Sequence, residues 1–207
     1  MSQLVIEYVF EGHHRGYNFT SPVDHYDDEI LKSIWRNAMP RGQGWGDALY
    51  YGARSLKAFQ LPDGRVAVSE VTVTDLVDES GRRGIRRAVI DVMTRSVFHL
   101  HLQSRLAGYP QDIRAGATLK RRELEQSFPR LKRGAPLILS HPFHSSFDWW
   151  IMEALIIDLA AHPPSRLQNK LVFPSFTTLA LTPHDGSQIV AIPQAKSINE
   201  KIPIAQL

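Results

Sequence analysis

The chain has 207 residues, of which 43% are hydrophobic and 22% are charged, and its formal net charge is +3. This length is enough to bury a sizeable core, and the composition is that of an ordinary globular protein. The sequence contains no cysteine, which excludes a disulfide framework and a thiolate site. No stretch of about 18 apolar residues is present to span a membrane, and residues 1–4 lack signal-like character, so we expect a cytoplasmic protein without a membrane partner.

The first half of the sequence predicts antiparallel strands and one helix. A short turn at residues 62–64 separates two stretches of strand-like alternation, which predicts a hairpin. Residues 79–84 predict a second hairpin, whose return strand has its better core face at Arg86, Ala88, Ile90 and Val92. The expected elements are a strand at 3–10, an extended segment at 17–21, a helix that begins with the acids at 24–28 and ends before Pro40, and strands at 55–60, 65–73 and 86–93.

The second half predicts helices that alternate with short apolar strands. The expected elements are helices at 96–107, 118–128 and 146–161, and strands at 136–140, 171–176 and 189–192. Residues 196–207 carry few structural signals and fit a linker or an interface segment. We therefore predict an α/β (α+β) fold that forms a single domain over residues 1–207, with a sub-boundary near 108–116. Early antiparallel hairpins would contribute to a mixed sheet on which the helices pack.

Basic residues form two clusters in the sequence. The first surrounds the second hairpin and consists of Arg82, Arg83, Arg86 and Arg87. The second is a basic helical stretch at residues 120–133. Such clusters bind phosphate groups, and Trp45, Tyr50 and Tyr51 would supply rings for base stacking, so one hypothesis is a nucleic-acid-binding subunit. Acidic residues interrupt both clusters, which equally fits solvated surfaces.

The densest group of chemically versatile side chains lies at residues 141–150, between an apolar strand and an apolar helix. The stretch reads His-Pro-Phe-His-Ser-Ser-Phe-Asp-Trp-Trp. The turn from a strand end into a helix N-terminus is a common place for active sites. If the protein is an enzyme, we expect His144 and Asp148, together with His141, to be its catalytic residues.

The spacing from His144 to Asp148 resembles the His-x-x-x-Asp motif of the superfamily of CoA- and carrier-dependent acyltransferases. This resemblance implies that His144 takes a proton from an acceptor hydroxyl or amine and that Asp148 holds the loop. The stretch also departs from that motif, which has two adjacent histidines and a glycine after the aspartate. Here Pro142 and Phe143 separate the histidines, and Trp149 follows Asp148.

Two other hypotheses use the same residues. His141, His144 and Asp148 are ligand types that suit zinc or iron, but a further strong ligand is needed. It would have to come from His13, His14, His162 or His184, none of which forms a recognisable pair with them. The structural hypothesis is that Ser145 or Ser146 caps the helix and that Asp148 favours its positive end. We expect no cofactor and no bound metal.

Three short stretches carry a family resemblance. The first strand ends in a turn at residues 10–17, Phe-Glu-Gly-His-His-Arg-Gly-Tyr, and is followed by an extended segment with a serine. The others are Asp-Glu-Ser-Gly-Arg-Arg-Gly at 78–84 and Phe-Pro-Ser-Phe-Thr-Thr at 173–178. Together they resemble the N-terminal domain of bacterial GTPase-associated proteins. Those proteins occur in multi-gene conflict (anti-phage) systems beside GTPases, AAA-type ATPases and effector proteins.

The resemblance covers most of the chain and implies a non-catalytic regulatory or adaptor domain at the front of a longer protein, with no catalytic residue carried over. The sequence therefore favours protein–protein interaction within a bacterial defence system, with a GTPase or an AAA-type ATPase among the partners. One alternative is an acyltransferase-like or metal-assisted enzyme centred on His144 and Asp148. The other is a nucleic-acid-binding subunit that uses the arginines of the second hairpin.

Overall fold

The computed structural model describes residues 1–10, 16–38, 54–81, 83–127, 137–141, 146–164, 172–177, 189–193 and 204–206. The chain divides into two compact units, Met1–Arg95 and Ser96–Leu207. The division falls ahead of residues 108–116, where the chain passes from one helix to the next. None of the helices in the described ranges is long and apolar enough to cross a bilayer.

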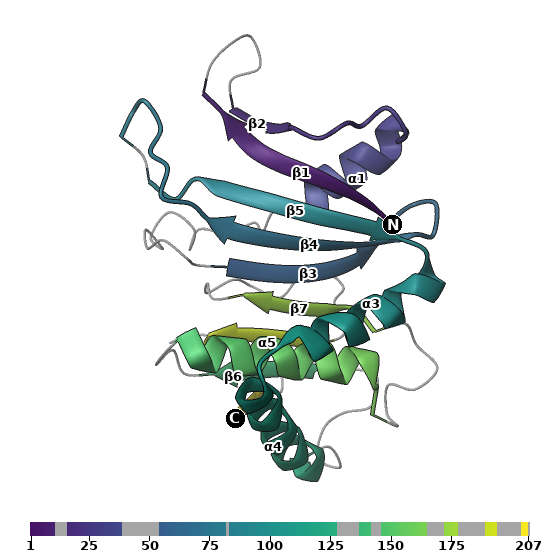
Figure 1. Ribbon diagram of the computed structural model, residues 1–207, viewed down its shortest axis with the longest axis vertical. Coiled ribbons are helices and arrows are strands. Elements are labelled where there is room, and N and C mark those ends of the chain that lie inside the picture. The colour runs from purple at the N-terminus through teal and green to yellow at the C-terminus, as the bar shows by residue number, and fades with distance from the viewer. Residues whose placement is uncertain are drawn as a thin grey trace. The chain divides into compact units, whose positions relative to one another are not determined.

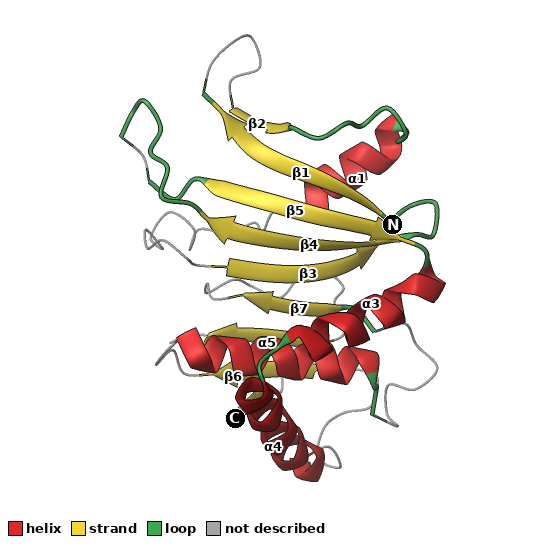
Figure 2. Ribbon diagram, viewed as in Figure 1, coloured by secondary structure: helices red, strands yellow, loops and turns green. Residues whose placement is uncertain are grey.

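The first unit contains an antiparallel sheet in the order β2-β1-β5-β4-β3 (Figures 1 and 2). Its strands are β1 (Ser2–Val9), β2 (Gly16–Phe19), β3 (Arg54–Gln60), β4 (Val66–Val73) and β5 (Arg86–Met93). The tight turn between β3 and β4 needs a left-handed residue, and Gly64 fills that position with a φ of 84°. Arg65 closes the turn by donating its backbone N–H to the Asp63 carboxylate at 3.0 Å.

Helix α1 (Asp28–Ala38) lies on one face of this sheet. Leu4, Ile90 and Ser69 are register partners across β1, β5 and β4, so their side chains share that face. Ser69 is fully buried and donates its hydroxyl to the carbonyl of Ala38 at the end of α1, at 3.0 Å. A buried hydroxyl with a partner is the expected arrangement in a core, and this bond fixes the helix against the sheet.

The opposite face of β1 and β5 is polar. Gln3 donates to Asp91 at 3.0 Å, and Arg87 forms an ion pair with Glu7. The predicted core face of β5 is confirmed, because Ala88, Ile90 and Val92 are buried while Arg86 is half-buried. The two predicted hairpins are also confirmed, since β3 pairs with β4 and β4 pairs with β5, both antiparallel.

The second unit contains parallel strands in the order β7-β8-β6-β9. These strands are β6 (Leu137–His141), β7 (Pro174–Thr177), β8 (Ile189–Pro193) and β9 (Ile204–Gln206). Its helices are α3 (Arg95–Gly108), α4 (Gln111–Ser127) and α5 (Ser146–Ala161). Helix α5 contacts β7 and β8 and packs against α4.

Helix α5 is apolar on all sides, and nearly all of its residues from Ile151 to Ala161 are buried. Such a helix needs apolar neighbours around most of its circumference, and the strands and α4 supply them. The contact with α4 is close at Gly116. A methyl group placed on Gly116 would lie 2.7 Å from Cδ1 of Ile151. Glycine in the middle of α4 therefore permits the two helices to approach.

The predicted α/β class is confirmed, with antiparallel pairing early in the chain and parallel pairing later. Three elements differ from expectation. Strand β7 begins at Pro174, whereas the sequence predicts a strand over residues 171–176. Helix α4 begins at Gln111 rather than Thr118, because Pro110 and the acidic Asp112 suit its first turn. Strand β9 lies in the tail for which no element was predicted, and its partner is the distant β6.

Candidate functional site

The stretch at residues 141–150 has the predicted local setting. His141 is the last residue of β6, in register with Pro193 of β8, and α5 begins at Ser146. Asp148 lies half-buried in the first turn of α5, where the helix dipole favours a negative charge. Residues 142–145, which include His144 and Ser145, lie outside the described residues. The convergence of His141, His144 and Asp148 on one site therefore stays a prediction.

The described arginines of the second hairpin do not all lie on one face of the sheet. Arg86 and Arg87 are neighbours in β5, so their side chains leave opposite faces of the sheet. The guanidinium of Arg86 lies 5.9 Å from the centre of the Tyr17 ring, whereas Arg87 pairs with Glu7 on the other face. Arg83 is exposed, and Arg82 lies outside the described residues. A continuous phosphate-binding surface would need these side chains on one face.

The second basic stretch is also divided. Lys120 and Arg122 belong to α4, and Arg122 is exposed. Arg121 instead turns inward to α5. Arg130, Lys132 and Arg133 lie outside the described residues, as do Trp45, Tyr50 and Tyr51.

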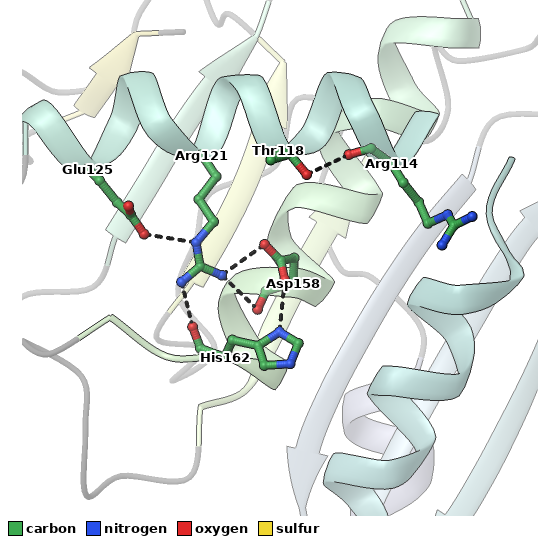
Figure 3. A network of polar contacts seen from close by, with 6 residues as sticks. All are labelled: Arg114, Thr118, Arg121, Glu125, Asp158 and His162. Carbon is green, nitrogen blue, oxygen red and sulfur yellow. Dashed lines mark hydrogen bonds and ion pairs between the residues drawn. The ribbon is translucent and has the colours of Figure 1, made fainter. Parts of the chain in front are cut away.

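Arg121 is the centre of a polar network that joins α4 to the end of α5 (Figure 3). Its Nη1 donates to Asp158 Oδ2 at 2.8 Å and also to the Asp158 carbonyl at 3.3 Å. Its Nη2 donates to the carbonyl of His162 at 2.8 Å, and its Nε donates to Glu125 Oε1 at 2.8 Å. All three guanidinium nitrogens thus have partners, and two of their acceptors are backbone carbonyls at the end of α5.

The network favours the charged form of Arg121. Burial acts to lower the pKa of the Arg121 guanidinium, but hydrogen bonds and Coulombic attraction to Asp158 and Glu125 outweigh it, so the pKa is raised. The other carboxylate oxygen of Asp158 lies 2.9 Å from Nδ1 of His162. Because an ionised carboxylate only accepts, the Nδ1 of His162 carries a proton, and its Nε2 is left for other contacts.

A pocket of about 430 Å³ opens beside this network, between α3, α4 and α5. Asp158 and His162 form one wall, and Arg114 and Thr118 of α4 form another. Leu106 is among the residues that α3 contributes. This volume lies within the range of small-molecule sites, which is roughly 300–1,000 Å³. The pocket combines apolar lining residues with charged side chains.

A second polar cluster is buried where α3 ends against α5. Glu153 has no exposed surface and accepts a hydrogen bond from the Tyr109 hydroxyl at 2.6 Å. Nη2 of Arg105 lies 3.6 Å from the same carboxylate oxygen. The ring of Trp150 packs edge-on against Tyr109, with centroids 5.8 Å apart. A carboxylate in an apolar helix requires such partners, so this cluster explains how α5 tolerates Glu153.

The loop that joins β4 to β5 exposes two consecutive aliphatic side chains. Leu76 and Val77 are 47% and 45% exposed. Thr74 anchors the base of the loop by donating both its backbone N–H and its hydroxyl to the carbonyl of Ile85, at 2.7 and 2.9 Å. Asp78 closes a turn by accepting from Ser80 and Gly81 at 2.9 and 2.8 Å. Hydrogen bonds therefore hold the backbone on both sides of Leu76 and Val77.

The sequence singles out neither the pocket nor the exposed pair Leu76 and Val77 as a site. The pairs Arg121 with Glu125 and Asp158 with His162 are each four residues apart on a helix, which is a readable signal. Nothing local indicates that these pairs meet. The sequence suggests His162 only as a metal ligand, and the described residues contain no group of three or more side chains suited to a metal.

Comparison of the chain with protein-family models, with curated proteins and with solved structures finds no match. Its function is therefore inferred from its own residues.

Proposed function

We propose that this chain is a non-catalytic adaptor domain that binds a protein partner in the cytoplasm, as part of a bacterial multi-component defence system. The resemblance at residues 10–17, 78–84 and 173–178 supports the choice of system, and a GTPase or an AAA-type ATPase of that system is the expected partner.

The observation that carries the proposal is the exposed Leu76–Val77 pair in the loop between β4 and β5. Single exposed aliphatic residues are common on protein surfaces, but two in succession between hydrogen-bonded backbone segments are suited to insertion into a partner. The loop projects beyond the ends of β4 and β5 (Figure 1). Its backbone hydrogen bonds reduce the entropy that would be lost on binding.

The charges around the pair define the chemistry of the partner. Asp75 and Glu79 are exposed on either side of Leu76 and Val77, and the half-buried Asp78 lies between them. A complementary surface is an apolar pocket with a basic rim, since unlike charges guide the encounter and fix its register. The loop contains the 78–84 stretch, which directly follows Leu76 and Val77. The proposed contact and the resemblance therefore fall on the same part of the chain.

The experiment is co-purification of the tagged chain with the products of its neighbouring genes, all expressed together. We expect one of these products to be retained at a defined stoichiometry. The double variant Leu76→Asp with Val77→Asp should lose it, because two charges would have to enter an apolar pocket. The matched control is Leu100→Asp on α3, which alters a side chain that is 64% exposed and leaves retention unchanged.

Two results would count against the proposal. If no neighbouring product is retained and the chain is a lone monomer in solution, the adaptor role is wrong. If the partner is retained equally by the double variant, the role survives but the loop is not the contact. Circular dichroism of each variant separates loss of binding from loss of folding.

A further inference from the structure

We propose that the pocket between α3, α4 and α5 binds a small organic carboxylate, a role that is independent of the partner-binding loop. Two charged side chains beside the pocket are already engaged with each other and with their neighbours. Asp158 uses both carboxylate oxygens, one for Arg121 and one for His162. Arg121 uses all three of its nitrogens. These two side chains therefore build the wall and present no free charge to a ligand.

Three groups in the pocket lining are available to a ligand: the guanidinium of Arg114, the amide of Gln103 and the Nε2 atom of His162. Within the part of the chain that the structure describes, the guanidinium of Arg114 and the amide of Gln103 make no hydrogen bond or ion pair. Figure 3 shows the Arg114 guanidinium standing apart from the Arg121 network. The Thr118 hydroxyl donates to the backbone carbonyl of Arg114 at 2.9 Å, and this bond does not involve the guanidinium. The open charge in the pocket is therefore positive.

One guanidinium is suited to one carboxylate, because its planar fork matches the two oxygens. A phosphate dianion would call for a second free cation, and Arg121 is not available. Gln103 and the imidazole Nε2 of His162 can bond to further polar atoms of a ligand. Leu106, Ala107 and Ala117 form the apolar part of the lining, so the body of the ligand is expected to be apolar.

The test is isothermal titration calorimetry of the full chain with hexanoate and with benzoate. Their uncharged counterparts, 1-hexanol and benzyl alcohol, and inorganic phosphate serve as comparison ligands. We expect saturable binding of at least one carboxylate at millimolar concentration and none of the alcohols or phosphate. Arg114→Ala should weaken binding by about tenfold or more, since a charge-assisted pair is lost. Ala107→Trp should abolish it by filling the pocket.

The matched control is Arg122→Ala, which removes an exposed arginine of the same helix that does not line the pocket. It should bind like the original chain. Arg114 and Ala107 are both exposed, so their replacement is expected to leave the fold intact, and circular dichroism checks this. The proposal is wrong if neither carboxylate binds, or if binding survives Arg114→Ala and Ala107→Trp unchanged. Phosphate binding that depends on Arg114 would overturn the assignment of the ligand class.

Discussion

Arg121 illustrates how one side chain can serve two helices. It belongs to a basic stretch of the sequence, yet it is held by Asp158 and Glu125 and by two carbonyl groups at the end of α5. The side chain is 19% exposed, so its charge is partly removed from water and depends on these partners. Asp158 depends on Arg121 in the same way, because its side chain is only 18% exposed.

Replacement of Arg121 by alanine is therefore expected to lower the free energy of unfolding by about 2 kcal/mol, within the range of broken, partly buried polar networks. The same change at the exposed Arg122 should alter it by less than about 0.5 kcal/mol, as at other surface positions. Urea unfolding followed by circular dichroism measures both. Equal values for the two variants would mean that the network contributes little to stability.

Glu153 is a residue whose burial can be anticipated from the sequence, although its partners cannot. An acidic residue in the middle of the apolar run at 146–161 signals a buried carboxylate that needs partners. Those partners, Tyr109 and Arg105, lie more than forty residues away in α3 and its end. The sequence indicates that a buried partner must exist, but its identity depends on how α3 packs against α5.

At the scale of elements, the strongest patterns were read correctly. Helix α5 has the predicted bounds, because its apolar run starts after polar residues and stops before two prolines. The hairpin of β3 and β4 was marked by its turn residues. Strand β9 escaped prediction because three residues carry no periodicity and become a strand only by pairing with β6. The start of α4 was missed because Gly116 resembled a boundary.

The same distinction between local patterns and distant contacts applies to the candidate sites. The setting of residues 141–150, a strand end followed by a helix, was predictable because both flanking elements have clear local patterns. The pocket was not, because its residues come from three helices and their meeting depends on the close contact of α4 with α5. Spacing along one helix reveals pairs such as Asp158 with His162, whereas contacts between helices require packing that the sequence does not display.

The contact between α4 and α5 makes its own prediction. Alanine at a mid-helix glycine usually stabilises by about 1 kcal/mol, but at Gly116 the new methyl would lie 2.7 Å from Ile151 Cδ1. Ile151→Val removes that atom and alone should cost about 0.5–1.5 kcal/mol. In the Gly116→Ala background the same change should cost less or become stabilising. Thermal and urea unfolding of the four proteins in a double-mutant cycle measure the coupling. Additive effects would show that the helices separate without cost.

At the scale of the whole molecule, the net charge of +3 is small and many arginines have acidic neighbours. Arg87 pairs with Glu7, Arg65 with Asp63 at 2.5 Å, and Arg121 with two carboxylates. In the part of the chain that the structure describes, these pairs neutralise much of the positive charge, so no broad positive surface forms there. Nucleic-acid binding relies on such a surface, because counterion release scales with the number of phosphates neutralised.

We accordingly expect a fluorescein-labelled single-stranded oligonucleotide to bind weakly. The slope of log K against log salt should be shallower than about −2, which corresponds to about three phosphates or fewer at −0.7 each. Fluorescence anisotropy over a range of salt concentrations gives this slope. If the hairpin arginines instead form a nucleic-acid site, binding will be tight at low salt and will fall steeply as salt is added. In that case Arg83→Ala with Arg86→Ala will weaken it far more than Arg122→Ala, since the hairpin charges would then contact the phosphates directly.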